Sequence, residues 1–88
     1  MNKIINSKKI YAIIICYNSS PAIEKLYKKI DKNLFDKIYF FDDNSTDNSY
    51  EEAKKFDWHV IKNDQNLGHG GNLKKAIETA FLDGADYA

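Results

Sequence analysis

The sequence predicts an α/β protein of three layers, with a mostly parallel sheet between helices. Short apolar segments rich in β-branched and aromatic residues alternate with segments of helical periodicity, in the order β-α-β-α-β-α-β. The segment 10–17 is apolar throughout, which is typical of a strand covered on both faces. A length of 88 residues allows one domain at most, so residues 1–88 are assigned to a single domain.

The composition indicates a folded protein without a strong electrostatic preference. Hydrophobic residues make up 43% of the chain and aromatic residues 14%, which argues against disorder. Thirteen basic and thirteen acidic residues cancel, so nothing favours nucleic acid or an anionic membrane as a partner. Cys16 is the single cysteine; it excludes an internal disulfide and is interpreted as a buried thiol.

The first half of the chain contains two predicted strands and one helix. Residues 10–17 form the first strand, which is too short to span a membrane and lacks the cleavage site of a signal peptide. Ser20 is expected to cap a helix that has Pro21 at its first position and an apolar stripe up to position 30. Residues 37–41 form the second strand, which leads directly into two adjacent aspartates.

The next two elements are shorter. Asp47 or Ser45 is expected to cap a second helix that runs to about residue 56, with acidic residues near its positive end. Residues 58–62 form a third, short strand. This second helix and third strand complete two strand–helix–strand units, whose crossovers are right-handed in a parallel sheet.

The last part of the chain carries the clearest helical pattern. Residues 63–71 form a polar loop with three glycines, and apolar residues from Leu73 onward recur at helical spacing. Gly84 is expected to end this helix, because glycine readily adopts the left-handed conformation that follows a helix. Residues 86–88 resemble the start of a fourth strand.

Three polar segments follow apolar strands: Tyr17 with Asn18, Asp42 with Asp43, and the loop 63–71. In a parallel sheet these segments converge at one edge, where ligands bind. An aspartate at such an edge can accept a hydrogen bond from a ribose hydroxyl or from the imide N–H of uracil, while its neighbour turns back to loop amides. The alternative is that both carboxylates only shape a turn.

The glycines of the loop 63–71 suggest close approach of an anion. Glycine lets backbone N–H groups come near a diphosphate, and a helix N-terminus favours negative charge; a tight turn is the alternative. The loop matches neither a Walker loop nor GxGxxG. His69 is interpreted as a polar loop residue, Lys74 and Lys75 as mainly solvated, and no zinc site is assigned.

Taken together and in order, three blocks resemble the N-terminal part of family 2 glycosyltransferases with the GT-A fold. They are AIIICYNSS, FFDDNSTDNS and NDQNLGHGGNLKKAIETAFLDGADYA, although Ile15 or Cys16 stands where many members have proline. The resemblance covers residues 9–88 and is greatest to the branch of polyprenyl- and dolichyl-phosphate sugar transferases. It implies the Rossmann-like half of the GT-A fold, truncated at the fourth strand.

The resemblance also implies nucleotide-binding residues. Asp43 is expected to contact the base, with Asp42 supporting the site, and Tyr17 is expected to lie along the base. Asn44 and Ser45 shape the turn, and the loop around Asn66 lines the pocket. No catalytic residue and no metal ligand is assigned. The expected nucleotide-binding residues are Tyr17, Asn18, Asp42, Asp43, Ser45, Asn66 and Gly68.

The implied substrates are a UDP-, GDP- or dTDP-linked sugar and an unidentified acceptor, either a lipid phosphate or a glycan. The family holds a divalent cation, Mg or Mn, with an Asp-x-Asp motif after the fourth strand. Asp83 and Asp86 have a different spacing and do not match that motif. The chain is therefore expected to carry the nucleotide-binding half of an enzyme and to transfer no sugar alone.

Two further expectations follow from the resemblance. Nucleotide sugars are cytosolic, so the location is expected to be cytoplasmic, at the inner face of the membrane for a full-length enzyme. An unfinished fourth strand leaves an open sheet edge, which favours self-association. The alternatives are a non-catalytic nucleotide-binding module, a truncated gene product, or an unrelated receiver-like signalling domain with Asp64 as phosphoacceptor.

Overall fold

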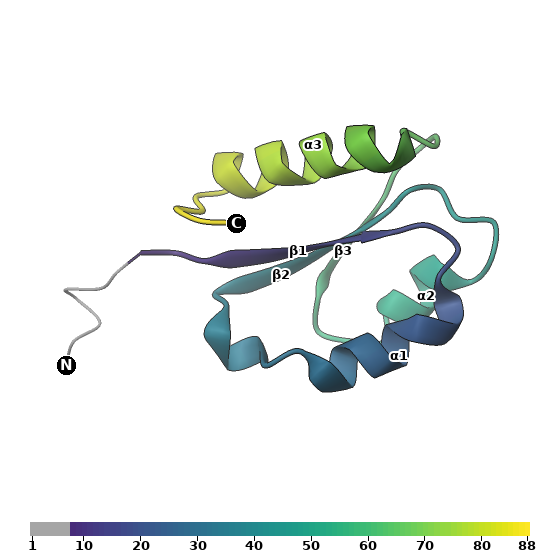
Figure 1. The fold of residues 1–88 in the computed structure, drawn as a ribbon, viewed down its shortest axis with the longest axis horizontal. Coiled ribbons are helices and arrows are strands. Elements are labelled where there is room, and N and C mark those ends of the chain that lie inside the picture. The colour runs from purple at the N-terminus through teal and green to yellow at the C-terminus, as the bar shows by residue number, and fades with distance from the viewer. Residues whose placement is uncertain (1–7) are drawn as a thin grey trace.

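A computed structural model describes residues 8–88, and the sheet lies between helices on both faces (Figure 1). Helix α3 covers one face, whereas α1 and α2 cover the other, so the predicted three-layer α/β architecture is confirmed. In chain order the elements are β1 (Tyr11–Cys16), α1 (Ser20–Lys29), the 3₁₀ helix η1 (Lys32–Leu34), β2 (Lys37–Asp42), α2 (Ser49–Ala53), β3 (His59–Lys62) and α3 (Gly68–Leu82).

The sheet consists of three parallel strands in the order β1-β2-β3. Ile14 pairs with Phe40, which pairs in turn with Val60. On the other side of β1, Tyr87 forms a parallel bridge with Ile10, as predicted for the start of a fourth strand. The chain therefore continues on opposite sides of β1, which creates the switch in strand order where ligands of such sheets bind.

Strand β2 divides the core into two halves because successive side chains point to opposite faces. Phe41 and Tyr39 pack under α3 against Ala76 and Ala80, whose small side chains let the helix approach the sheet. Ile38 and Phe40 face α1 and α2, together with Cys16, Ile23, Ala53 and Trp58. Cys16 is 4% exposed, which confirms the expected buried thiol, and its burial raises the pKa.

Helices α1 and α2 begin differently from the sequence-based expectation. Ser19, not Ser20, is the N-cap of α1, and its side chain makes no capping hydrogen bond. Instead the Ser19 N–H donates to Oγ of Ser49 (2.9 Å), and the Ser20 N–H donates to the Asp47 carboxylate (3.2 Å). Helix α2 starts after Asn48 and ends at Ala53, so it is shorter at both ends than predicted.

Helix α3 begins at Gly68 rather than Leu73, so the glycines form its first turn. Its end is as predicted. Gly84 has φ = 108°, and the N–H of Ala85 donates to the carbonyl of Ala80 (3.0 Å), which is the Schellman pattern. No helix in residues 8–88 has the length and apolar character needed to cross a membrane.

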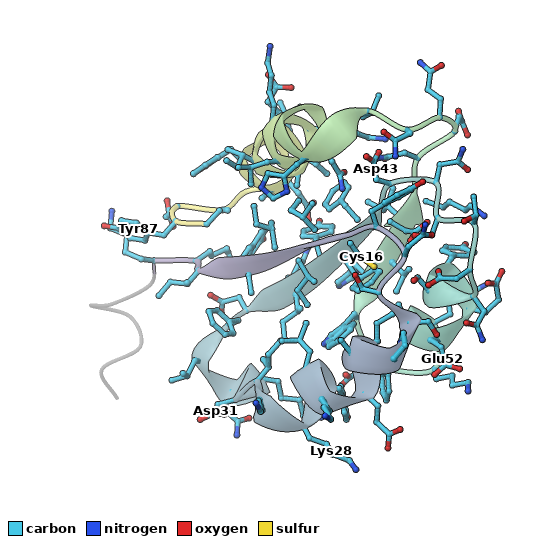
Figure 2. All side chains as sticks on the ribbon, turned by 45° about the vertical axis from the view of Figure 1, so that its right-hand side comes forward. Cys16, Lys28, Asp31, Asp43, Glu52 and Tyr87 are labelled. Carbon is cyan, nitrogen blue, oxygen red and sulfur yellow. The ribbon has the colours of Figure 1, made fainter. Side chains whose placement is uncertain are left out.

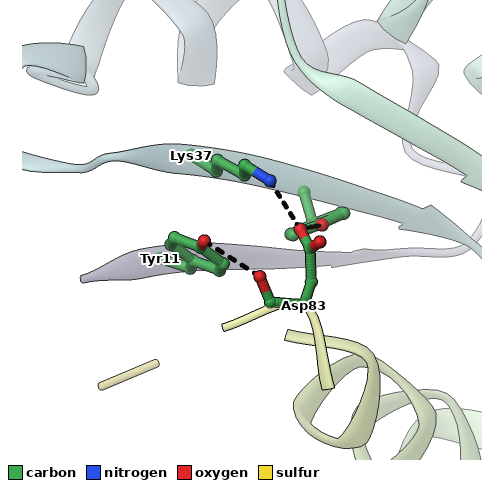
Figure 3. Close-up of polar contacts among 4 residues, drawn as sticks. Tyr11, Lys37 and Asp83 are labelled. Atoms are coloured by element: carbon green, nitrogen blue, oxygen red, sulfur yellow. Dashed lines mark hydrogen bonds and ion pairs between the residues drawn. The ribbon is translucent and has the colours of Figure 1, made fainter. Parts of the chain in front are cut away.

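A cluster of polar side chains from β1 and β2 contacts Asp83 at the end of α3 (Figure 3). Nζ of Lys37 lies 2.7 Å from Oδ2 of Asp83, and the Tyr39 hydroxyl donates to the same oxygen. The Tyr11 hydroxyl donates to the Asp83 carbonyl (3.2 Å). The hydrogen bond from Lys37 holds the pKa of Asp83 below its usual value, and burial together with Asp83 raises the pKa of Tyr39 to about 12.

Candidate functional site

The three polar segments meet at the carboxyl edge of the sheet, as the sequence predicts, around a cavity of about 360 Å³. Figure 2 shows Asp43 beside the start of α3 and Cys16 at the end of β1. A cavity of this size is at the small end of the range for ligand pockets. Its lining residues are Ile15, Cys16 and Tyr17 from the end of β1, Asp43 after β2, and Asn66, Gly68 and His69 around the start of α3.

Asp43 lies at this cavity and also holds the N-terminus of α3. Its side chain is buried, with 2% of the residue exposed. Oδ1 accepts hydrogen bonds from the Leu67 N–H (2.7 Å) and from Nδ2 of Asn63 (3.0 Å), and Oδ2 accepts one from the Gly68 N–H (2.9 Å). A carboxylate in this position satisfies N–H groups that have no partner within the helix and complements the helix dipole.

Asp42 is fully buried and faces away from the cavity. Its two carboxylate oxygens accept hydrogen bonds from the N–H (2.9 Å) and the hydroxyl (2.5 Å) of Ser45. Asp42 therefore stabilises the turn after β2, and Ser45 is its partner in that turn. Neither residue is part of the cavity lining.

Asn18 joins the first two polar segments and does not line the cavity. Its backbone is in the left-handed region (φ = 50°), and its N–H donates to Oγ of Ser45 (2.9 Å). Its side-chain oxygen accepts from the N–H groups of Thr46 (2.8 Å) and Asp47 (3.3 Å). The contacts of Asn18 fix the position of the turn that carries Asp43.

Tyr17, Asn66 and Gly68 line the cavity as the sequence predicts. The Tyr17 side chain is 49% exposed and makes no hydrogen bond with the described residues. Nδ2 of Asn66 donates to the Asp43 carbonyl (3.2 Å), and its Oδ1 accepts from the Gly68 N–H (3.0 Å). Gly68 has φ = 79°, so glycine is required here by backbone conformation rather than by lack of space.

A buried polar network that the sequence pattern did not reveal contacts Asp43. Nδ2 of Asn63 donates to Asp43 and to Oδ1 of Asn72 (2.9 Å), while Oδ1 of Asn63 accepts from Nζ of Lys75 (2.7 Å). Nδ2 of Asn72 donates to the Phe41 carbonyl (3.1 Å). Asn72 precedes Ala76 by four residues on the apolar stripe of α3, and this spacing could have identified it as an inward-facing polar residue.

The glycine turn, at which the sequence suggested a diphosphate, already has a carboxylate partner. Two of the N–H groups at that turn, those of Leu67 and Gly68, already donate to Asp43. Lys75, which the sequence suggested to be solvated, bonds Asn63 instead. Within residues 8–88, no three His, Cys, Asp or Glu side chains lie close enough together to hold a metal ion.

Residues 11–83 match the sequence family described as Glycosyl transferase family 2. The chain belongs to glycosyltransferase family 2. It is 30% identical over 98 residues to the UDP-N-acetylglucosamine--dolichyl-phosphate N-acetylglucosaminyltransferase of Methanococcus voltae, with 92% of this chain and 39% of that protein covered. It is 32% identical over 78 residues to an uncharacterized protein of Methanocaldococcus jannaschii, with 89% of this chain and 32% of that protein covered.

A third relative of this family 2 chain is the processive diacylglycerol beta-glycosyltransferase of Mycoplasma pneumoniae, 30% identical over 86 residues, with 88% of this chain and 24% of that protein covered. The chain thus spans two fifths or less of the length of these relatives. No solved structure matches it. The family and the dolichyl-phosphate relative confirm the resemblance and its branch, and they decide against a receiver-like signalling domain.

Proposed function

We propose that this chain is the nucleotide-binding part of a glycosyltransferase that uses a nucleotide-diphosphate sugar as donor. The observation that carries the proposal is the shared cavity: Tyr17, Asp43, Asn66 and Gly68 come from three separate segments and line the same space. This cavity lies at the carboxyl ends of parallel strands, beside the switch in strand order at β1, which is where ligands bind in such sheets.

The lining offers the contacts that a nucleoside needs. The exposed ring of Tyr17 provides a flat face on which a base can stack, and Ile15 adds apolar surface beside it. The Asp43 carboxylate provides an acceptor for a base N–H. Because its hydrogen bonds to Asn63, Leu67 and Gly68 hold Asp43 in place, it is positioned before a ligand arrives.

The names of two relatives suggest the kind of acceptor. One is named for dolichyl phosphate and another for diacylglycerol, so we propose a lipid or lipid-phosphate acceptor for this family member. The divalent cation expected from the resemblance, Mg or Mn, finds no ligand set within residues 8–88. We therefore expect nucleotide binding by this chain to be independent of such a cation.

Calorimetric titration of the 88-residue chain with UDP and GDP, with and without Mn²⁺, tests the proposal. Tyr17→Ala is the informative variant, because this exposed side chain has no hydrogen bond to residues 8–88 that the substitution would remove. Tyr87→Ala is the matched control. Tyr87 is 56% exposed and pairs with Ile10, the residue before β1, so it lies at the opposite end of that strand from the cavity. We expect binding that Tyr17→Ala weakens about tenfold, as for loss of one base stack, and that Tyr87→Ala preserves.

Two outcomes would contradict this proposal: a folded chain that binds neither nucleotide, or equal weakening by both tyrosine variants. A non-catalytic module would give the same binding result as a part of an enzyme. Incubation of a nucleotide sugar with the chain and a lipid-phosphate acceptor tests only whether this chain is active by itself. We expect no sugar transfer by the 88-residue chain alone, and turnover would refute that expectation.

A further inference from the structure

The orientation of the Asn63 side chain is fixed by its neighbours. The Lys75 ammonium carries only donors, so the Asn63 atom 2.7 Å from it must be the amide oxygen. The NH₂ group of Asn63 therefore points the other way, and its two N–H bonds donate to Asp43 and Asn72. Asn63 is 2% exposed and Asn72 is fully buried, so water does not compete for these contacts.

The two oxygens of Asp43 consequently differ in what they can still accept. A carboxylate has about four acceptor positions, two on each oxygen. Oδ1 is filled by the Leu67 N–H and the Asn63 amide, whereas the Gly68 N–H is the one donor to Oδ2 among residues 8–88. One acceptor position thus remains, on Oδ2.

The remaining position is on the oxygen that bonds a lining residue of the cavity. Gly68, whose N–H bonds Oδ2, is a lining residue, whereas Leu67 and Asn63, which fill Oδ1, are not. Both positions on Oδ1 are thus taken by residues outside the lining, and the one open position is on the oxygen bonded to a lining residue. A ligand in the cavity meets one carboxylate acceptor, not a pair.

We propose that this cavity selects a base with a single imide N–H, as in uracil or thymine, over guanine, and that Asn63 is the positioning residue that sets this selectivity. The inference rests on the proposed function and deepens it. Uracil and thymine present one N–H between two carbonyl oxygens, which matches one free acceptor. Guanine presents adjacent N1–H and N2–H donors, which are best bound by both oxygens of one carboxylate.

A series of nucleotides tests the selectivity without altering the protein. UDP, dTDP, CDP, GDP and N3-methyl-UDP are titrated separately into the chain, after far-UV circular dichroism has shown that it is folded. CDP has the ring size of UDP but an acceptor at N3, and the N3-methyl group removes the imide donor. We expect UDP and dTDP to bind about tenfold or more tightly than the other three, the effect of one hydrogen bond to a charged acceptor.

The outcomes separate this inference from the proposed function. If the folded chain binds none of the five nucleotides, the proposed function fails and the inference with it. If nucleotides bind but GDP or CDP equals or exceeds UDP, or N3-methyl-UDP binds as well as UDP, only the inference is overturned. The expected order supports both.

The role of Asn63 is tested by the ratio of UDP to GDP affinity, a readout that a merely structural role would not move. Asn63→Ala removes one donor to Oδ1 of Asp43 and so frees an acceptor position on that oxygen. We expect the ratio of UDP to GDP affinity to fall at least about threefold, which corresponds to part of the free energy of one hydrogen bond. Asn33→Ala is the matched control, because Asn33 is exposed in η1 and its side chain forms no hydrogen bond with the residues that the structure describes. An unchanged ratio in folded Asn63→Ala would overturn the assigned role. If that variant does not fold, the nucleotide series decides the proposal.

Discussion

Replacement of Asp43 by alanine should lower the stability of the whole chain, because this carboxylate is shared by β2 and α3. The change removes the acceptor of two backbone N–H groups, those of Leu67 and Gly68, and of the buried Asn63 amide. Loss of a helix cap costs about 0.5–2 kcal/mol, and a buried donor left without a partner costs about 1–3 kcal/mol. We therefore expect the free energy of unfolding to fall by about 3 kcal/mol.

This loss is a large share of the stability of a small domain, which is typically about 5–15 kcal/mol. Urea unfolding followed by far-UV circular dichroism measures this loss of free energy. In thermal unfolding, the midpoint temperature should fall by roughly 12–24 °C. Asp64→Ala is the matched control, since Asp64 is exposed and accepts no hydrogen bond from residues 8–88; its effect should stay within about 0.5 kcal/mol. A loss below about 1 kcal/mol in Asp43→Ala would refute the capping role.

Further predictions concern the ends of α3 and its outer surface. Gly84→Ala should destabilise the chain by about 1–2 kcal/mol, because φ is 108° there, whereas Gly70→Ala, with no atom near its added Cβ, should be neutral or stabilising in the same unfolding assay. Asp83→Asn should lower the melting temperature at pH 7; since the folded pKa of Asp83 is depressed, the difference from the native chain should begin to shrink near the usual value of 3.8 and vanish as pH falls through the lower folded pKa. The raised pKa of Tyr39 predicts that the chain loses stability between pH 10.0 and about 12. Tyr39→Phe should make this loss smaller, as measured by alkaline unfolding followed by phenolate absorbance. The side chain of Phe81 is 47% exposed on α3, and we expect self-association that Phe81→Glu weakens in sedimentation velocity; a monomeric native chain at all concentrations would contradict this.

The fold could be predicted where local pattern and global packing agree. Strand β2 was expected at 37–41 and lies at Lys37–Asp42, because its run of large apolar residues has no stable place except between two helical layers. The stop at Gly84 followed from backbone sterics alone. Features of this kind depend on nearby residues, so a single sequence reveals them.

The starts of the helices could not be predicted, since groups remote in sequence determine them. Glycine disfavours a helix, so the pattern pointed to Leu73 as the first helical residue. The structure starts α3 at Gly68, where the carboxylate of Asp43 accepts the first N–H groups from 25 residues away. Helix α1 is likewise anchored by Asp47 and Ser49 rather than by its own serine.

The candidate site could be predicted only in part, because some of its contacts also join residues that are remote in sequence. The order of strands and polar segments was enough to bring Tyr17, Asp43 and Gly68 to one cavity. Which oxygen of Asp43 stays available depends on Asn63 and on the lysine that orients it, and these contacts exist only after β3 and α3 have packed together. A motif locates the carboxylate, whereas tertiary structure decides what the carboxylate can accept.

Strand alternation explains why two adjacent aspartates are tolerated at the end of β2. Side chains at consecutive positions of a strand point to opposite faces, so Asp42 turns toward the layer of α1 and α2 and Asp43 toward α3. Each carboxylate meets its own donors, Ser45 on one side and the start of α3 on the other. The pair therefore fixes the turn after β2 on one face of the sheet and the start of α3 on the other. Because only Asp43 lines the cavity, the ligand site and the attachment of α3 depend on the same side chain, and substitution there cannot test binding separately from folding.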